Sequence, residues 1–189
     1  VTITQSRRWL PDEVGGVVWY GPCNPDLTCY VPLYAGMNEL TPIMNEKAGS
    51  HQEFTRESFR WAVSAVSTFA DYMYSYISQD ILAFRENYTG KWLKEQETID
   101  NIAVELFKED PVLGREFITN YCNNNIKVAR DAWWGLLDEL FRKYDMTQIY
   151  DADPVNGIST KTSPVWDEDY VRFLVNADPA GEPGEVRNN

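Results

Sequence analysis

Two short runs of apolar and aromatic residues, 14–20 and 28–36, flank the turn-forming segment GPCNPD near the start of the chain. β-Branched and aromatic runs bounded by Gly, Pro, Asn and Asp are typical of a β-hairpin. Neither run alternates between polar and apolar positions, which predicts that the hairpin is covered on both faces and lies inside a larger sheet. Nothing later in the chain looks like enough strand to complete that sheet. We therefore expect its other strands to lie outside this chain.

A helical pattern follows the hairpin. Thr55 is a suitable N-cap residue, and apolar residues then recur over 59–84 with the three-and-four spacing of one helix face. Gly90 should end or bend this helix, and a second helix is predicted from 92 to about 109. A strong boundary at Asp110-Pro111 then opens a third helix over 111–143, because Asp caps helices well and Pro is tolerated at the first position.

Weaker signals complete the pattern. Weak helix formers at 123–125 allow a break in the third helix. Residues 1–8 are polar, and we expect them to be extended or to end a helix that began upstream, while Pro32 should lie at an edge or bulge of its strand. The predicted organisation is a hairpin over 1–42, a helical layer over 43–150 and an irregular tail over 151–189 with a short helix at 167–174. These parts form one domain fragment of the α+β class, mostly helical.

Composition narrows the class of protein. The 189 residues are 43% hydrophobic, enough for one domain with a real core. A net charge of −12 argues against a nucleic-acid partner, because that binding depends on Lys and Arg, and it suits a soluble protein. No apolar run approaches the roughly 20 residues of a membrane span. The opening VTITQSRR lacks the apolar core of a signal peptide. In a portion of a longer protein, this observation does not decide between a cytoplasmic and an exported location.

Catalytic constellations are scarce in the sequence. Cys23, Cys29 and Cys122 are interpreted as free and mostly buried thiols, although the first two lie near the ends of the predicted turn and could approach each other. There is no CxxC, and His51, in the polar segment GSHQE, is the only histidine. We expect His51 to be solvated, and we predict no metal site. No GxSxG, HExxH, GxGxxG or Walker pattern occurs, and no cofactor is predicted.

Other candidates have a simpler interpretation as structure. Arg7 and Arg8 could hold a substrate carboxylate as bidentate donors, but a surface ion pair is favoured. The pair Trp133-Trp134 is interpreted as packing rather than as a ligand platform. Two further patterns carry little weight. Asp167, Glu168 and Asp169 form an acidic run, which is interpreted as solvated. Asn87, Tyr88 and Thr89 match a glycosylation sequon, which is a common pattern.

One segment resembles a known family. From Arg7 to Pro42 the chain reads RRWLPDEVGGVVWYGPCNPDLTCYVPLYAGMNELTP. This resembles the PepD-type dipeptidases, cysteine members of the N-terminal-nucleophile (Ntn) hydrolases, in three elements: R-x-W-L-P, a G-G-V-x-W strand, and a Y-V-P-x-Y-x-G strand. The later helical stretches resemble the family more loosely, so that the likeness covers roughly residues 3–145.

The resemblance implies a fold and a chemistry. The family is a four-layer αββα sandwich whose nucleophile is an amino-terminal Cys, with the free α-amino group as base. This chain starts at Val1, and its cysteines match no nucleophile motif. We therefore expect the catalytic residues upstream and assign none here. The implied partners are the amino-terminal half of the same parent and a small peptide substrate, and an uncovered apolar face would favour a homodimer.

Two alternatives stay open. The chain could be a stand-alone helical interaction module whose hairpin and aromatic face bind a partner protein. It could also come from an acylase-type relative that acts on amide bonds other than those of dipeptides, since specificity would depend on residues outside this sequence.

Overall fold

The computed structural model describes residues 1–44, 50–152, 157, 159–164, 168 and 171–172. The chain divides into two compact units, Val1–Leu140 and Phe141–Asn189. The predicted helix at 167–174 lies largely outside the described residues, as does the rest of the tail, although 168, 171 and 172 are helical.

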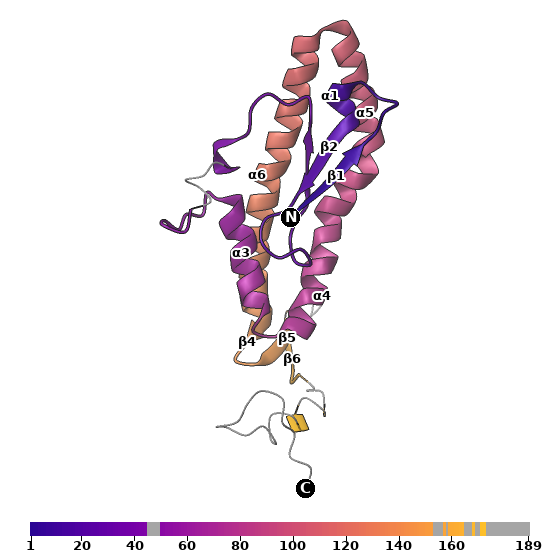
Figure 1. Cartoon of the computed structure of the whole chain (residues 1–189). Coiled ribbons are helices and arrows are strands. Elements are labelled where there is room, and N and C mark those ends of the chain that lie inside the picture. Colours follow the sequence, from indigo (N-terminus) through magenta and orange to yellow (C-terminus); the bar gives the residue numbers. More distant parts are fainter. Residues whose placement is uncertain (45–49, 153–156, 158, 165–167, 169–170, 173–189) are drawn as a thin grey trace. The chain divides into compact units, whose positions relative to one another are not determined.

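The first unit contains an antiparallel sheet in the order β1-β2-β3 (Figure 1). Its strands are β1 (Thr2–Ser6), β2 (Gly16–Tyr20) and β3 (Val31–Tyr34), and the short helix α1 (Asp12–Gly15) connects the first two. The predicted hairpin is confirmed as β2 and β3, with shorter strands. The extended conformation predicted for residues 1–8 is also confirmed, and it adds a third strand. Pro32 lies on an edge strand, as predicted, because β3 pairs with β2 alone.

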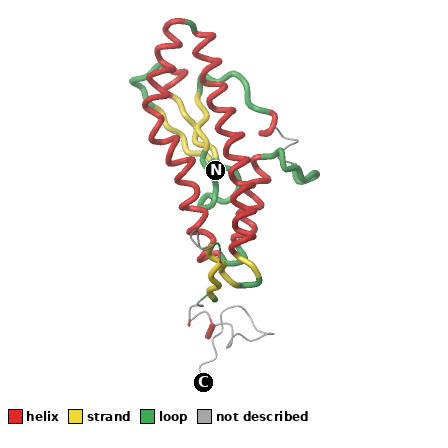
Figure 2. Tube along the Cα trace, turned by 180° about the vertical axis from the view of Figure 1, so that it is seen from behind, coloured by secondary structure: helices red, strands yellow, loops and turns green. Residues whose placement is uncertain are grey.

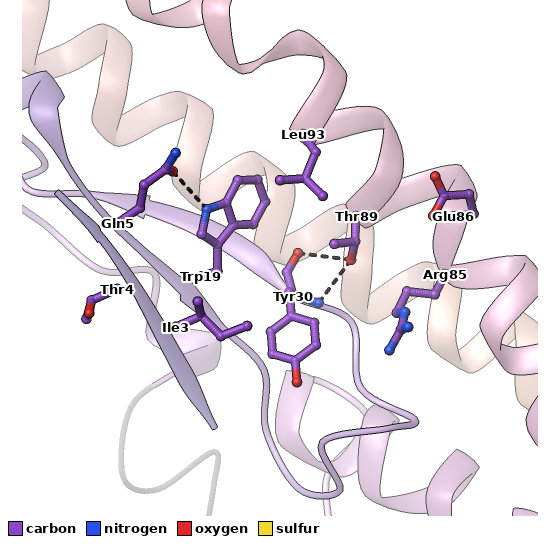
Figure 3. A pocket seen from close by; sticks show the side chains of 9 residues that line it. All are labelled: Ile3, Thr4, Gln5, Trp19, Tyr30, Arg85, Glu86, Thr89 and Leu93. Atoms are coloured by element: carbon purple, nitrogen blue, oxygen red, sulfur yellow. Dashed lines mark hydrogen bonds between the residues drawn. The ribbon is translucent and has the colours of Figure 1, made fainter. Parts of the chain in front are cut away.

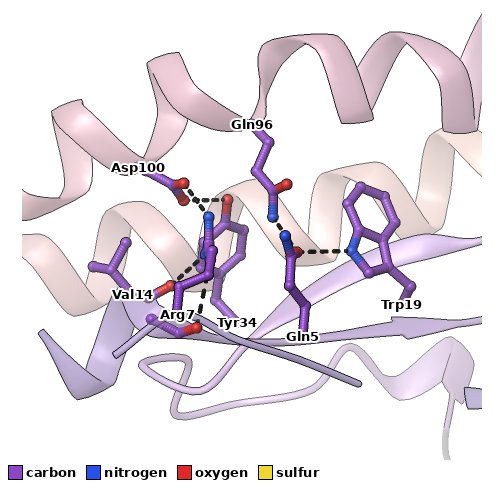
Figure 4. A network of polar contacts seen from close by, with 8 residues as sticks. Gln5, Arg7, Val14, Trp19, Tyr34, Gln96 and Asp100 are labelled. Atoms are coloured by element: carbon purple, nitrogen blue, oxygen red, sulfur yellow. Dashed lines mark hydrogen bonds and ion pairs between the residues drawn. The ribbon is translucent and has the colours of Figure 1, made fainter. Parts of the chain in front are cut away.

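The two faces of this sheet are covered unequally. Val17, Trp19 and Tyr34 are buried, whereas Val18 and Leu33 on the opposite face are only half-buried. Helices of the same unit lie against the first face (Figure 4). The described residues therefore cover one face of the hairpin fully and the other only in part.

The long helices begin with α3 (Phe59–Ala70) and α4 (Tyr74–Arg85), which follow a 3-10 turn at Pro42–Met44. The N-cap of α3 is Ser58, whose hydroxyl accepts a hydrogen bond from the backbone N–H of Trp61, so the prediction of Thr55 was wrong by one turn. The single helix predicted over 59–84 is interrupted at 71–73.

Helix α4 does not end at Gly90. A π-helical turn, η2 (Glu86–Gly90), continues directly into α5 (Lys91–Glu109). Such π-turns within helices are often found at functional sites.

Helix α6 (Pro111–Lys143) has the predicted bounds. Asp110 accepts a hydrogen bond from the backbone N–H of Val112, as expected of a cap. The break allowed at 123–125 does not occur, because tertiary contacts hold the weak helix formers: Asn125 is buried and Asn123 accepts a hydrogen bond from the backbone of Thr41. Helices α5 and α6 lie side by side in both views (Figures 1 and 2).

The second unit contains a sheet that the sequence did not predict. Its strands are β4 (Tyr144–Asp145), β5 (Gln148–Ala152) and β6 (Ser159–Thr162), in sequential antiparallel order. These strands lie where a helical layer to 150 and an irregular tail from 151 were expected. These strands form their own sheet and add nothing to β1-β2-β3. The α+β class with an antiparallel hairpin and long helices is confirmed. Within the described residues, no helix combines the length and the apolar character needed to cross a bilayer.

Candidate functional site

A buried polar cluster joins the sheet to α5 (Figure 4). Arg7, which follows β1, forms an ion pair with Asp100 of α5, and both side chains are 7% exposed. The Tyr34 hydroxyl of β3 donates to the other oxygen of Asp100 at 2.8 Å. Arg7 also donates to the backbone carbonyls of Val14 and Gly15. Several hydrogen bonds thus compensate for burying the two charges.

A second polar link lies one turn of α5 away. The Gln96 side chain donates to the carbonyl oxygen of the Gln5 side chain at 2.7 Å, and the Trp19 indole donates to the same oxygen at 3.3 Å. The two links, Gln5–Gln96 and Arg7–Asp100, show that α5 runs along β1.

The environment of this cluster suppresses ionisation of its tyrosine. Burial, and then the hydrogen bond to Asp100, raises the pKa of Tyr34 well above its usual range. Tyr34 therefore remains a hydrogen-bond donor at physiological pH and cannot act as a base. The Arg7–Asp100–Tyr34 cluster positions elements rather than transferring protons.

A pocket of about 440 Å³ lies beside this cluster, between the sheet and the turn from α4 into α5 (Figure 3). Gln5 lies at one end of the pocket and Arg85 at the other, with Trp19 and Leu93 between them. The full lining is Ile3, Thr4, Gln5, Trp19, Tyr30, Arg85, Glu86, Thr89 and Leu93. Glu86 lies beside Arg85, so the pocket combines an apolar middle with an end that carries both charges, which suits an apolar group with a polar or charged tip.

The three cysteines are free, and two of them are buried. This confirms their interpretation as mostly buried thiols. Burial raises the pKa of Cys29 to about 12 and that of Cys122 to about 12. Because the thiolate is the nucleophile, these two groups are unreactive near neutral pH. Cys23 is exposed, and its thiol donates to the backbone carbonyl of Arg60 at 3.7 Å.

His51 is exposed, as predicted, and its ring contacts Arg60 and the edge of Trp61. No hydrogen bond in the described part of the chain joins His51 to a thiol. Nor does that part contain a group of three or more His, Cys, Asp or Glu side chains able to hold a metal ion.

The other sequence candidates also have clear positions. The favoured surface ion pair is wrong for Arg7, whose pair with Asp100 is buried because the chain turns inward after β1, whereas Arg8 is exposed. Trp133 and Trp134 are buried, as predicted for packing. In the sequon Asn87 is exposed, and of the acidic run only Glu168 lies within the described residues, where it pairs with Arg172.

Sequence reasoning missed Asp100, Tyr34 and Thr89. Asp100 could have been noticed as a carboxylate on the apolar face of α5, where it lies three residues before the buried Ala103. The Tyr34 and Thr89 contacts carry no local signal, since their partners are 66 and 59 residues away.

Comparison with known proteins adds one match. Residues 1–87, less than half of the chain, match the model of peptidase family C69, which confirms the resemblance to the PepD-type dipeptidases over the sheet, α3 and α4. The matched segment supports a peptidase function. No curated protein matches the chain.

Proposed function

From the match of residues 1–87 to peptidase family C69, we propose that this chain is the carboxyl-terminal portion of a cysteine dipeptidase. The parent protein hydrolyses dipeptides or other small amides, and its nucleophile is an amino-terminal Cys outside these residues. This portion supplies a sheet, the helical layer on one face of that sheet, and part of the wall around the substrate.

The state of the thiols supports this proposal. Cys29 and Cys122 are buried, with pKa values raised to about 12, so neither supplies a thiolate at neutral pH. Cys23 is exposed, but its Sγ contacts a backbone carbonyl rather than a base. A nucleophile needs an adjacent base or a lowered pKa. The two buried thiols have raised pKa values, and among the described residues no base forms a hydrogen bond with Cys23.

The half-covered face of the sheet agrees with packing of this sheet against another layer of the parent protein. Val18 and Leu33 are half-buried, while Thr2, Thr4 and Ser6 of β1 are exposed on the same face. In an αββα sandwich this face would pack on a second sheet, and the helices would form the outer layer.

The proposal is tested by assaying this chain and the full-length parent on a panel of dipeptides, with and without iodoacetamide. We expect hydrolysis by the parent, loss of that hydrolysis after alkylation, and no hydrolysis by this chain. Thiol-dependent hydrolysis by this chain alone would overturn the proposal. In the parent, Cys23→Ala serves as the control, because this exposed thiol lacks a base and its removal should leave the rate unchanged.

A second candidate function, a protein-interaction module, is favoured by an exposed aromatic group. Phe54 is 60% exposed and contacts the rings of Trp61 and Trp134 at 5.6 and 6.0 Å. This reading predicts a monodisperse chain that unfolds cooperatively and binds a partner through Phe54. Light scattering distinguishes the two, because a portion of a sandwich with a half-covered sheet face should self-associate, whereas an interaction module should stay monodisperse.

A further inference from the structure

The outer edge of β1 carries unused backbone groups. The pairs Val1–Gly21 and Arg7–Gly15 are hydrogen-bonded, and bonded pairs alternate along an antiparallel ladder. The backbone groups of Ile3 and Gln5 therefore point to β2. Those of Thr2, Thr4 and Ser6 point away from the sheet, and they have no hydrogen-bond partner among the described residues.

The outer edge of β3 is closed. The bond from Ala35 N–H to Gly16 O sets the ladder, so that the backbone groups of Tyr30, Pro32 and Tyr34 point outward. Thr89 Oγ1 accepts from Tyr30 N–H at 3.0 Å, Cys122 Sγ accepts from Tyr34 N–H at 3.5 Å, and Pro32 has no N–H. No outward donor remains on β3 for another strand.

The two edges thus differ in protection. Proteins guard free edges with proline, charge, bulges or covering side chains. β3 has a proline and two covering side chains, whereas β1, with the sequence Thr-Ile-Thr-Gln-Ser, has neither proline nor charge. An unguarded, uncharged edge is suited to pairing.

The pocket continues from this edge. Ile3 lies on the buried face opposite Trp19, yet it is 53% exposed because the described residues place no strand beyond it. Leu93, across the pocket, is also 53% exposed. In a strand added at β1, the residue opposite Ile3 would point to this face and fill the space between Ile3 and Leu93 (Figure 3).

The charges of the chain indicate which kind of segment pairs with β1. Two copies of this chain would bring net charges of −12 together, which opposes edge-to-edge pairing of copies. Arg85, at one end of the pocket, donates only to the Asp26 carbonyl in the described part of the chain. Its remaining N–H groups can bind a carboxylate of the incoming segment, since the neighbouring Glu86 pairs with Lys94.

We propose that β1 is the acceptor edge of this sheet, and that it binds an extended strand from the amino-terminal half of the parent protein. The strand is antiparallel or parallel to β1, places an apolar side chain beside Ile3 and Leu93, and carries a carboxylate near Arg85. This inference rests on the proposed function for the source of the strand, but the acceptor edge itself follows from the backbone geometry.

Hydrogen exchange of single amides tests the acceptor edge. In this chain the amides of Thr2, Thr4 and Ser6 should exchange quickly, while those of Ile3 and Gln5 are internal controls protected by β2. In the full-length parent we expect the three outward amides to slow by roughly tenfold or more, because each is then hydrogen-bonded. Equal exchange in both proteins would overturn the proposal.

A pair of matched variants tests the same contact in the parent. Thr4→Pro removes the outward N–H without removing a bond to β2, and proline is tolerated on edge strands. Thr4→Val removes the hydroxyl but keeps the N–H. We expect Thr4→Pro to restore fast exchange at Thr2 and Ser6, and Thr4→Val to leave it slow. Identical exchange in the two variants would contradict the proposal.

Two further results separate the possible failures. If this chain alone dimerises and its outward amides are protected in a concentration-dependent way, the occupant is a second copy and the proposal is wrong. If the parent protects these amides but hydrolyses no dipeptide, the acceptor edge stands and the peptidase function fails.

Discussion

The carboxylate of Asp100 on α5 forms a buried ion pair with the guanidinium of Arg7, and the two residues are 93 positions apart in the sequence. Removing one partner of such a pair leaves an uncompensated buried charge, which is strongly destabilising. We predict that Asp100→Ala lowers the free energy of unfolding by about 3–5 kcal/mol, measured by urea denaturation.

The matched control is Glu105→Ala, which removes an exposed ion pair with Lys108 on the same helix. Exposed pairs contribute about 0–1 kcal/mol, so this variant should unfold almost as the unmodified chain does. Equal losses in the two variants would show that the buried pair has no special role.

Alkaline pH should destabilise the first unit. The pKa of Cys29 and that of Cys122 are raised from 9.0 to about 12, and burial also raises the pKa of Tyr121 to about 12. Above pH 9 the unfolded thiols lose their protons while the folded ones keep them. Stability is therefore fully present below pH 9 and is lost as the pH rises toward 12.

The measurement is the free energy of unfolding at several pH values from 7 to 11. Each thiol contributes a slope of up to about 1.4 kcal/mol per pH unit in the range above pH 9. Cys122→Ala should reduce the slope, because it removes one of the two buried thiols whose pKa is raised. A flat profile in the unmodified chain would contradict this prediction.

Thr89 closes one end of β3 by accepting from Tyr30 N–H at 3.0 Å and donating to Tyr30 O at 3.1 Å. Thr89→Val keeps the shape but leaves two backbone groups unsatisfied. We predict a loss of about 1–3 kcal/mol in unfolding free energy, together with faster exchange of the Tyr30 amide. Thr89→Ser, which keeps the hydroxyl, should retain slow exchange of the Tyr30 amide. If Thr89→Ser exchanges as fast as Thr89→Val, the hydroxyl alone does not protect this amide and the prediction is wrong.

The N-cap of α3 is Ser58, whereas the local sequence pattern predicted Thr55. The Ser58 hydroxyl accepts from Trp61 N–H at 3.2 Å, whereas the Thr55 hydroxyl caps only an exposed turn by accepting from Glu57 N–H. We predict that Ser58→Ala costs about 1 kcal/mol in thermal or urea unfolding, and Thr55→Ala less. The reverse order would place the functional cap at Thr55.

Much of the fold was predictable because it depends on neighbours in sequence. The bounds of α6 follow from Asp110, Pro111 and the apolar period, and the hairpin follows from turn residues between apolar runs. The β4–β5 hairpin was missed because its two turn residues, Met146 and Thr147, have positive φ angles of 46° and 63° without Gly or Asn to signal them.

The sequence by itself determined the β2–β3 hairpin and the long helices α5 and α6, and residues 1–87 match the model of a peptidase family. Only the tertiary structure decided that Arg7 is buried, that Thr89 and Cys122 close β3, and that β1 keeps its outward backbone groups free of partners in the described residues. The physical reason is that periodicity records burial along one element. Which side chain reaches a distant backbone group depends on how separate elements pack.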